Sequence, residues 1–339
     1  MSCRAGGAHQ HSDNERLYRK GAEGKEKQMN INEFTAFAAE EVLKRLPEEM
    51  RGSVSVQTAE VMKINDQIMH GLAFHKGDEP APTFYLDDLF DVYQHGADPK
   101  EILRGLVDTY VDCYANAKAG DEDIPIPTVI PDMSFRNISR MTNVRLLGMD
   151  YNQKFLETVP YRDVGNGYAL VSELQIDASN EGVFSTIITN EMAEEYGYNM
   201  ERLFDRALEN AWRTNAAAFV RAEDVMCGDI TCGDDTCGDG TCDGTESCWV
   251  LSTARQRFGA VALFYPGTQA MIADVLNEDY IAIPSSLHEF IILRNSIVTD
   301  PIHLQRLVIQ ANHTIVSPED VLSDNVLYYS RSRQCITVL

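Results

Sequence analysis

Two short stretches of the sequence carry side chains that could do chemistry. The first is SSLHE at 285–289, where a histidine and a carboxylate follow two hydroxyl groups. A histidine beside a carboxylate can transfer protons or bind a metal. The zinc-protease pattern needs a second histidine four residues later, where this chain has Ile292, and neither serine lies in a G-x-S-x-G elbow. The candidate catalytic residues are Ser285, Ser286, His288 and Glu289.

The same stretch also has a structural interpretation. It follows the apolar run YIAIP, so the two serines can satisfy backbone groups at a strand end. His288 and Glu289 would then fix the turn between two buried strands. We favour this structural role over catalysis.

The second stretch is rich in cysteine and runs from 227 to 248. It contains Cys227, Cys232, Cys237, Cys242 and Cys248. Thiolates are soft ligands for zinc, Cu(I) or iron–sulfur clusters, although structural zinc sites usually pair cysteines more closely. The aspartate spacing does not fit an EF-hand, and only half of a secreted disulfide repeat is present. Because glycine and aspartate follow most of these cysteines, we expect a flexible acidic loop, with zinc or other soft-metal binding and redox function as alternatives.

Other polar residues give weaker signals. His303 and His313 lie ten residues apart on a predicted helix, which favours surface or capping roles. Arg162 and Asp163 are adjacent and favour a structural ion pair over an anion site. The sequence has no Walker loop, no G-x-G-x-x-G motif and no kinase signature, which argues against nucleotide chemistry of those kinds.

Composition limits the possible partners and compartments. The 339 residues carry a formal net charge of −23, which repels phosphate backbones and argues against nucleic-acid binding. No apolar run approaches the ~18 residues of a membrane span, and residues 1–28 lack the apolar core of a signal peptide. We therefore expect a cytoplasmic protein with no membrane association. Residues 1–28 would be a disordered leader or a misplaced start before Met29.

Hydrophobic periodicity predicts the elements that position these residues. Asn32 can cap a helix that ends at Pro47, and two antiparallel strands then meet at Asn65-Asp66. A short strand at 81–86 and helices at 87–95 and 98–118 follow. The three prolines in 119–134 indicate a linker.

The rest of the chain predicts two further units. The middle one has a hairpin turning near 179–182 and a helix over 200–213. The last unit reads β-β-α-β-β-α-β, with FGAVALFY at 258–265 as its second strand, so the fold class is α+β. The predicted segments are the leader 1–28, the N-terminal α+β unit 29–118, the linker 119–134, the middle unit 135–215, the cysteine-rich loop 222–247 and the C-terminal unit 248–331.

The last 80 residues also carry a family resemblance. The stretch GAVALFYPGTQAMIADVLNEDYIAIPSSLHEF, together with NHTIVSPEDVLSDNVLYYS at 312–330, resembles an uncharacterised family of anaerobic Gram-positive bacteria, domain of unknown function 5688. The resemblance runs from about Met29 to Arg331 and implies a fold and a compartment, but no reaction. A second uncharacterised family, domain of unknown function 1444, is similar more distantly. The cysteine stretch lies where a variable acidic linker is expected.

Three hypotheses about function follow. The favoured one is a non-enzymatic binding or adaptor protein for an unknown protein or small molecule, because no complete catalytic constellation is present. The second is a hydrolase or metal-dependent enzyme centred on the turn at 284–289. The third is soft-metal or thiol handling by the loop from Cys227 to Cys248. The sequence leans against an enzyme and predicts no particular cofactor.

Overall fold

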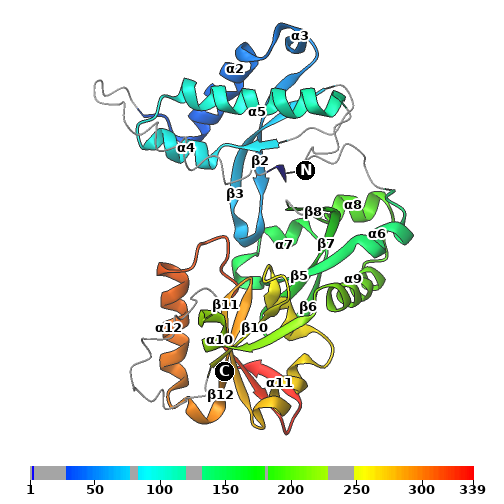
Figure 1. Cartoon of the computed structure of the whole chain (residues 1–339), viewed down its shortest axis with the longest axis vertical. Coiled ribbons are helices and arrows are strands. Elements are labelled where there is room, and N and C mark those ends of the chain that lie inside the picture. The colour runs from blue at the N-terminus through cyan, green and yellow to red at the C-terminus, as the bar shows by residue number, and fades with distance from the viewer. Residues whose placement is uncertain (1, 4–27, 77–82, 120–131, 180–181, 228–247) are drawn as a thin grey trace, which may run out of the picture. The chain divides into compact units, whose positions relative to one another are not determined.

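The fold is α+β, as the sequence predicts. The computed structural model describes residues 2–3, 28–76, 83–119, 132–179, 182–227 and 248–339 (Figure 1). The chain divides into two compact units. The first comprises residues 1–63, 67–131 and 176–186, and the second comprises residues 64–66, 132–175 and 187–339. The segment boundaries expected from the sequence stay a proposal.

The first unit is a small sheet with helices. Its elements are β1 (Ser2–Cys3), α2 (Ile31–Arg45), α3 (Glu48–Arg51), β2 (Ser55–Met62), β3 (Ile68–His75), β4 (Thr83–Tyr85), α4 (Asp87–Gln94) and α5 (Pro99–Ala119). The strand order is β1-β4-β3-β2, with β2, β3 and β4 antiparallel and β1 parallel to β4. Helix α2 begins two residues earlier than expected. Its cap is Asn30, not Asn32, because Asn30 and Glu33 exchange side-chain and backbone hydrogen bonds in a capping box.

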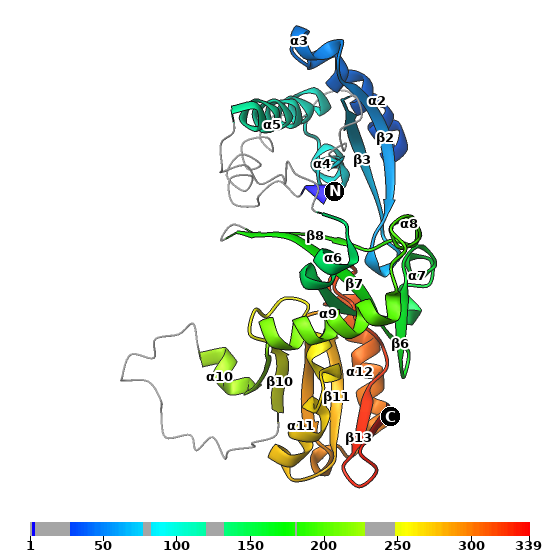
Figure 2. The same ribbon diagram turned by 90° about the vertical axis from the view of Figure 1, so that its right-hand side faces the viewer.

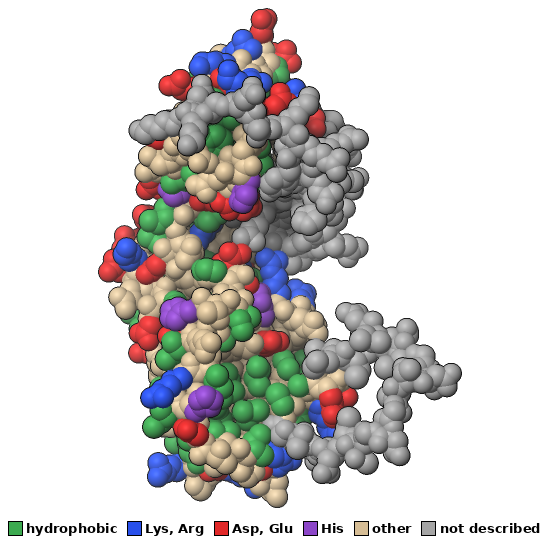
Figure 3. All heavy atoms as spheres, turned by 90° about the vertical axis from the view of Figure 1, so that its left-hand side faces the viewer, with side chains coloured by type: hydrophobic (Ala, Val, Ile, Leu, Met, Phe, Trp, Pro, Cys, Tyr) green, Lys and Arg blue, Asp and Glu red, His purple; other side chains and the backbone are tan. Residues whose placement is uncertain are grey.

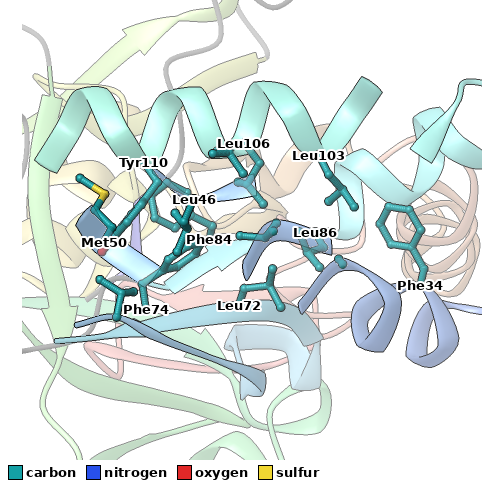
Figure 4. Close-up of a cluster of buried hydrophobic side chains, with 14 residues drawn as sticks. Phe34, Leu46, Met50, Leu72, Phe74, Phe84, Leu86, Leu103, Leu106 and Tyr110 are labelled. Atoms are coloured by element: carbon teal, nitrogen blue, oxygen red, sulfur yellow. The ribbon is translucent and has the colours of Figure 1, made fainter. Parts of the chain in front are cut away.

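The core of the first unit is largely aromatic and aliphatic (Figure 4). Helices α2 and α5 supply Phe34 and Leu103, and strand β3 supplies Leu72, all with no exposed surface. Phe74 stacks on Tyr110 with ring centroids 4.1 Å apart. Burial of side chains of this size contributes roughly 1.5–3 kcal/mol each before entropy is counted.

The second unit contains two sheets. Its first elements are η1 (Ile64–Asp66), α6 (Phe135–Met141), β5 (Thr142–Gly148), η2 (Met149–Tyr151), α7 (Phe155–Thr158), β6 (Tyr161–Gly165), β7 (Tyr168–Ser179), α8 (Asn190–Glu195) and α9 (Met200–Thr214). Residues 176–186, which include the end of β7 and most of β8 (Gly182–Ile187), belong to the first unit. One sheet has the order β5-β7-β6, with β8 also paired to β7. Helix α9 packs on β5, and Asn210 donates hydrogen bonds to the carbonyls of Ser139 and Thr142.

The other sheet has six antiparallel strands in the order β14-β13-β11-β12-β10-β9. Its elements are β9 (Ala217–Arg221), α10 (Ala222–Cys227), β10 (Cys248–Thr253), η3 (Gly259–Phe264), α11 (Thr268–Leu276), β11 (Tyr280–Ser286), β12 (Glu289–Arg294), η4 (Asn295–Ile297), α12 (Pro301–Thr314), β13 (Leu327–Ser330) and β14 (Cys335–Val338). Helix α12 lies on one side of this sheet, and η3 and α11 lie on the other (Figures 1 and 2).

One predicted strand of the last unit is wrong. Residues 259–264 form the 3-10 helix η3, and five of them are buried, Gly259 to Leu263. A fully buried apolar run has no alternation, so periodicity cannot separate a strand from a helix there. Strands β9 and β14 were not expected. The order is therefore β9-α10-β10-η3-α11-β11-β12-α12-β13-β14, with η4 a single turn before α12.

A buried pair of asparagines holds the turn η1 in the second unit. Asn152 Oδ1 accepts the Asn65 backbone N–H at 2.6 Å, and Asn152 Nδ2 donates to Asn65 Oδ1 at 2.9 Å. Asn65 Nδ2 also donates to the carbonyls of Pro318 and Val321. Asn65 has φ 59°, a left-handed conformation that asparagine tolerates better than most residues. The turn is thus built into the second unit by side-chain hydrogen bonds.

Among the described residues, no helix combines the length and the apolar character needed to cross a membrane.

Candidate functional site

The SSLHE stretch forms a tight turn between β11 and β12. The pairing of the two strands shifts between Pro284 and Ser286, which marks a bulge. Ser286 Oγ accepts the backbone N–H of His288 at 3.1 Å. Leu287, 1% exposed, donates its backbone N–H to the carbonyl of Asp320 at 2.8 Å. Hydrogen bonds to neighbouring segments therefore hold the turn on more than one side.

His288 bridges two distant parts of the chain. Its Nδ1 accepts the backbone N–H of Phe258 at 2.9 Å, and its Nε2 lies 3.3 Å from Asp320 Oδ1. Because Nδ1 is an acceptor, the neutral ring carries its proton on Nε2, facing the carboxylate. Both ring nitrogens are thus engaged within the protein. Proton transfer to an external substrate would require one of these contacts to break.

The segment that meets His288 is unusually bent. Gln256 and Phe258 have φ values of 54° and 53°, both in the left-handed region. Gly259 then passes so close to β10 that a Cβ atom would lie 2.2 Å from Ser252 Oγ and 2.7 Å from the His288 carbonyl oxygen. Only glycine fits there without a shift of the backbone. Ser252 Oγ donates to that same carbonyl at 2.8 Å.

An aromatic ring connects this turn to the first sheet of the second unit. The Arg145 guanidinium lies 3.7 Å from the centre of the Phe258 ring, a cation–π contact. Arg145 also forms an ion pair with Glu173 on the neighbouring strand, and both side chains are largely buried. No motif in the sequence marks these contacting residues as part of a site. They are Arg145, Glu173, Phe258 and Asp320. Their contacts join residues about 30 or more positions apart and leave no local pattern.

Ser285 and Glu289 face a different direction from His288. Ser285 Oγ donates to Glu289 Oε1 at 3.2 Å. Glu289 alternates with buried Phe290 along β12, so it shares a face of the sheet with Ile291 and Leu293. The four predicted residues therefore do come together in one turn. They form a hydrogen-bonded strand end with one carboxylate on the outer face.

The other candidate ligands do not assemble in the described residues. His303 and His313 are exposed on α12, and no group of three or more His, Cys, Asp or Glu side chains in the described part could hold a metal ion. Arg162 pairs with Glu201 and Asp205 of α9, not with the adjacent Asp163. Arg162 therefore forms ion pairs, but with partners other than the adjacent carboxylate expected from the sequence.

Most of the cysteine stretch lies outside the described residues, including Cys232, Cys237 and Cys242. Cys227 ends α10, and Cys248 begins β10 as a half-buried free thiol. Burial raises the pKa of the Cys248 thiol. Since a thiol must lose its proton to bind a metal, this shift works against Cys248 as a ligand.

The second unit exposes an apolar surface next to this stretch. Strand register places alternate residues of three neighbouring strands on the side of the sheet that carries α12. This apolar sheet face consists of Ala218, Val220, Cys248, Val250, Ile291 and Leu293. Val220 is 40% exposed, and the other five are half-buried. Figure 3 shows hydrophobic side chains gathered on this side of the second unit.

Fold and site together define an α+β protein with a helix-flanked antiparallel sheet, a rigid polar turn and an exposed apolar face. The chain belongs to the family of unknown function DUF5688, whose model matches residues 31–331. This assignment confirms the resemblance found in the last 80 residues. Searches of curated proteins and of solved structures gave no match. The more distant resemblance to family 1444 stays a prediction.

Proposed function

We propose that this protein is a non-enzymatic binding protein that docks a partner protein on the apolar sheet face. The observation that carries the proposal is the solvent exposure of Val220, Val250 and Ile291 on three adjacent strands. Scattered apolar residues are normal on a surface, but contiguous apolar patches often mark interaction sites. The face has a rigid support, because the opposite sides of the same strands bury Trp249, Leu251 and Ile292.

The arrangement of the layers supports this role. Helix α12 packs through Leu304 and Val308 on the part of the sheet around Ile281. The face over β12, β10 and β9 continues the same surface, and its side chains keep part of their exposure. A partner seated there would complete the helix layer on that side of the sheet.

The enzyme hypothesis has less support from the geometry. Both ring nitrogens of His288 have partners within the chain, and the hydroxyl of Ser285 faces a carboxylate instead of an imidazole. A carboxylate is a weak base toward a hydroxyl, so this pair lacks the base that activates a serine nucleophile. A catalytic role of Ser285, Ser286, His288 and Glu289 stays a prediction, as does soft-metal binding by the cysteine stretch.

The test compares two exposed valines of the second unit. Val220 lies on the apolar sheet face, and Val275, 59% exposed, lies on α11 on the opposite side. Tagged wild type, Val220→Ser and Val275→Ser are purified from the native host, and co-purifying proteins are quantified. We expect one protein to be lost with Val220→Ser and kept with Val275→Ser. Loss of one side chain's contact should weaken binding about 5- to 20-fold.

Amide hydrogen exchange on the purified complex then locates the contact. Added protection in β9, β10 and β12 supports the proposal. Equal recovery of every partner with both variants, or protection confined to other elements, would overturn it.

The cytoplasmic location predicted from the sequence belongs to the same proposal. Fractionation of the native host, with a secreted marker, a membrane marker and a cytoplasmic marker, checks it directly.

A further inference from the structure

We infer that protonation of His288 releases the Phe258 end of the bent segment 254–258, so that this segment and the imidazole form a pH-dependent switch. Such a switch goes beyond the proposed binding role and does not involve the apolar sheet face. Three features of the second unit support it: the hydrogen bonds of the imidazole, the exposed and strained backbone of the segment, and the position of the Phe258 ring.

The imidazole of His288 can hold the segment only while the ring is neutral. Its Nδ1 accepts the backbone N–H of Phe258 at 2.9 Å, and its Nε2 lies 3.3 Å from Asp320 Oδ1. Both nitrogens of an imidazolium carry a proton, so Nδ1 would then direct a donor at another donor. Histidine ordinarily changes its charge between pH 5 and 8, and the His288 side chain is 32% exposed to solvent. Protonation of this ring therefore breaks the hydrogen bond to Phe258.

The bent segment can open without its neighbours. Residues 254–257 are exposed, whereas Thr253 before the segment and Gly259 after it are buried. Gln256 and Phe258 both have left-handed φ values. Such a backbone costs free energy in residues other than glycine and persists where surrounding contacts hold it. Loss of one of those contacts lets the segment relax.

The two ends of the segment are held differently. At its start, the backbone N–H of Arg255 donates to Asn215 Oδ1 at 3.0 Å, and that of Gln256 donates to the Thr253 carbonyl at 2.9 Å. Amide and carbonyl groups keep the same charge at pH 5 to 8. At the other end, the acceptor is an imidazole. A fall in pH therefore acts directly on the Phe258 end.

Release of Phe258 would also change the surroundings of a buried ion pair. The Arg145 guanidinium lies 3.7 Å from the centre of the Phe258 ring, and Arg145 pairs with Glu173. Both of these side chains are largely buried. Movement of the ring would remove a cation–π contact and one side of the cover over this pair. The open and closed states thus differ in packing as well as in one hydrogen bond.

Charges of both signs act on the imidazole from the elements around it. The Asp320 carboxylate favours the imidazolium, whereas the positive charges of Arg145 and Arg257, both over the Phe258 ring, oppose it. Ser285 donates to the neighbouring carboxylate, Glu289, and η3 contributes no titratable side chain. The charged residues in the elements that contact His288 or Phe258 are Arg145, Glu173, Arg255, Arg257, Glu289, Glu319 and Asp320. Removal of the Asp320 charge should therefore shift the opening to lower pH.

The experiment measures amide hydrogen exchange of the full chain by mass spectrometry at pH 5.5 and 7.5. Each rate is divided by that of an unstructured synthetic peptide of residues 250–262, which removes the intrinsic effect of pH on exchange. For the shortest proteolytic peptide that contains Phe258, we expect the corrected rate to be about 2- to 12-fold higher at pH 5.5. This range corresponds to the net contribution of one hydrogen bond. Peptides from β11 and β12 should keep their corrected rates, because the sheet stays folded.

Three variants identify the titrating group. In His288→Asn, the side-chain oxygen can accept the Phe258 N–H and does not titrate, so the ratio of the two corrected rates should be near 1. The ratio would also be near 1 if this variant lost the hydrogen bond, because exchange would then be fast at both pH values. Asp320→Asn should have a smaller ratio than wild type. His303→Ala, on the exposed side of α12, is the control and should keep the wild-type ratio.

Three results would overturn the switch. The first is a wild-type ratio near 1. The second is a wild-type ratio that persists in His288→Asn, since another group would then titrate. The third is an equal rise in the peptides from β11 and β12, since the whole sheet would then be opening. None of these results affects the test of the apolar sheet face with Val220→Ser.

Discussion

The backbone N–H of Phe258 donates to Nδ1 of His288, and this hydrogen bond of 2.9 Å joins the bent segment before η3 to the turn between β11 and β12. The two rings also lie 5.3 Å apart between centroids. Phe258 in turn contacts Arg145 of β5. One imidazole thus belongs to a chain of contacts that connects the two sheets of the second unit, which explains why a histidine at a turn can matter for folding.

Replacement of His288 by Ala should lower the free energy of unfolding by about 1–3 kcal/mol, because the Phe258 N–H loses its acceptor and Asp320 loses its partner. Urea unfolding measures the change. His303→Ala, on an exposed position of α12, is the control and should stay within about 0.5 kcal/mol of wild type. An unchanged stability for His288→Ala, combined with loss of a measurable turnover, would instead favour the catalytic role.

Gly259→Ala should destabilise the protein by roughly 1–3 kcal/mol or more, since the new Cβ would overlap Ser252 Oγ and the backbone of Thr253. Gly105 offers a control of opposite sign. It lies in α5, and a methyl group added there would meet no other atom within 4 Å, so Gly105→Ala should stabilise the protein by up to about 1 kcal/mol. Thermal unfolding measures the change in stability of both variants. A change of the same sign in both would contradict the steric crowding expected at Gly259.

Asn65 and Asn152 should behave as a coupled pair. Asn152→Ala removes the acceptor of the Asn65 backbone N–H. Asn65→Ala removes an acceptor of Asn152 Nδ2 and the donor to the buried carbonyls of Pro318 and Val321, and each change should cost about 1–3 kcal/mol. The double variant should therefore be less destabilised than the sum of the two, by about 0.5–3 kcal/mol. A double-mutant cycle from denaturant unfolding measures the coupling. Strict additivity would show that the two amides contribute independently.

Stability should depend on pH through Asp279. The Tyr328 hydroxyl, followed by the Arg331 backbone N–H, holds the pKa of this carboxyl below its ordinary value of 3.8. A depressed pKa in the folded state contributes stability above the unfolded pKa, and this contribution is lost as the pH falls through the folded pKa. Wild type should exceed Asp279→Asn in melting temperature at pH 6, and the gap should begin to narrow near pH 3.8 and close as the pH falls through the lower folded pKa. A gap that stays constant over pH 6 to 2.5 would contradict the assignment.

The parts of the fold that could be predicted are those with local signals. Helices α4 and α5 follow apolar periodicity, and Gly96 stands at the break between them with φ 96°. The turn at Asn65-Asp66 was expected from its residue types. Residue spacing and residue type were sufficient to predict these helices and this turn, because tertiary packing did not override the local preferences.

Other elements depend on contacts that the sequence does not reveal locally. Strand β9 follows α9 almost directly and begins with two alanines, Ala217 and Ala218, which favour continued helix over strand. It becomes a strand because β10 pairs with it, with Val250 opposite Val220. The 3-10 helix η3 consists of glycine and apolar residues, so its sequence has no periodic pattern from which a helix could be predicted.

The candidate site likewise combines residues that the sequence could identify with residues that it could not. The cluster at 285–289 could be found because its polar residues are adjacent. The role of His288 could not be assigned, since Phe258 and Asp320 lie about 30 residues away on either side. The apolar sheet face was also missed, because it depends on the register of three strands, one of which was not predicted.

The placement of Asn65 has a consequence for how this chain can be divided into fragments. Three residues of a turn near the N-terminal end complete a unit whose other residues begin at 132. A fragment beginning at 132 would lack the amide that satisfies Asn152, Pro318 and Val321. The C-terminal half therefore cannot be transferred to another gene as a contiguous cassette without this loss. The family match, which extends over 31–331, includes both this turn and the rest of the second unit up to residue 331.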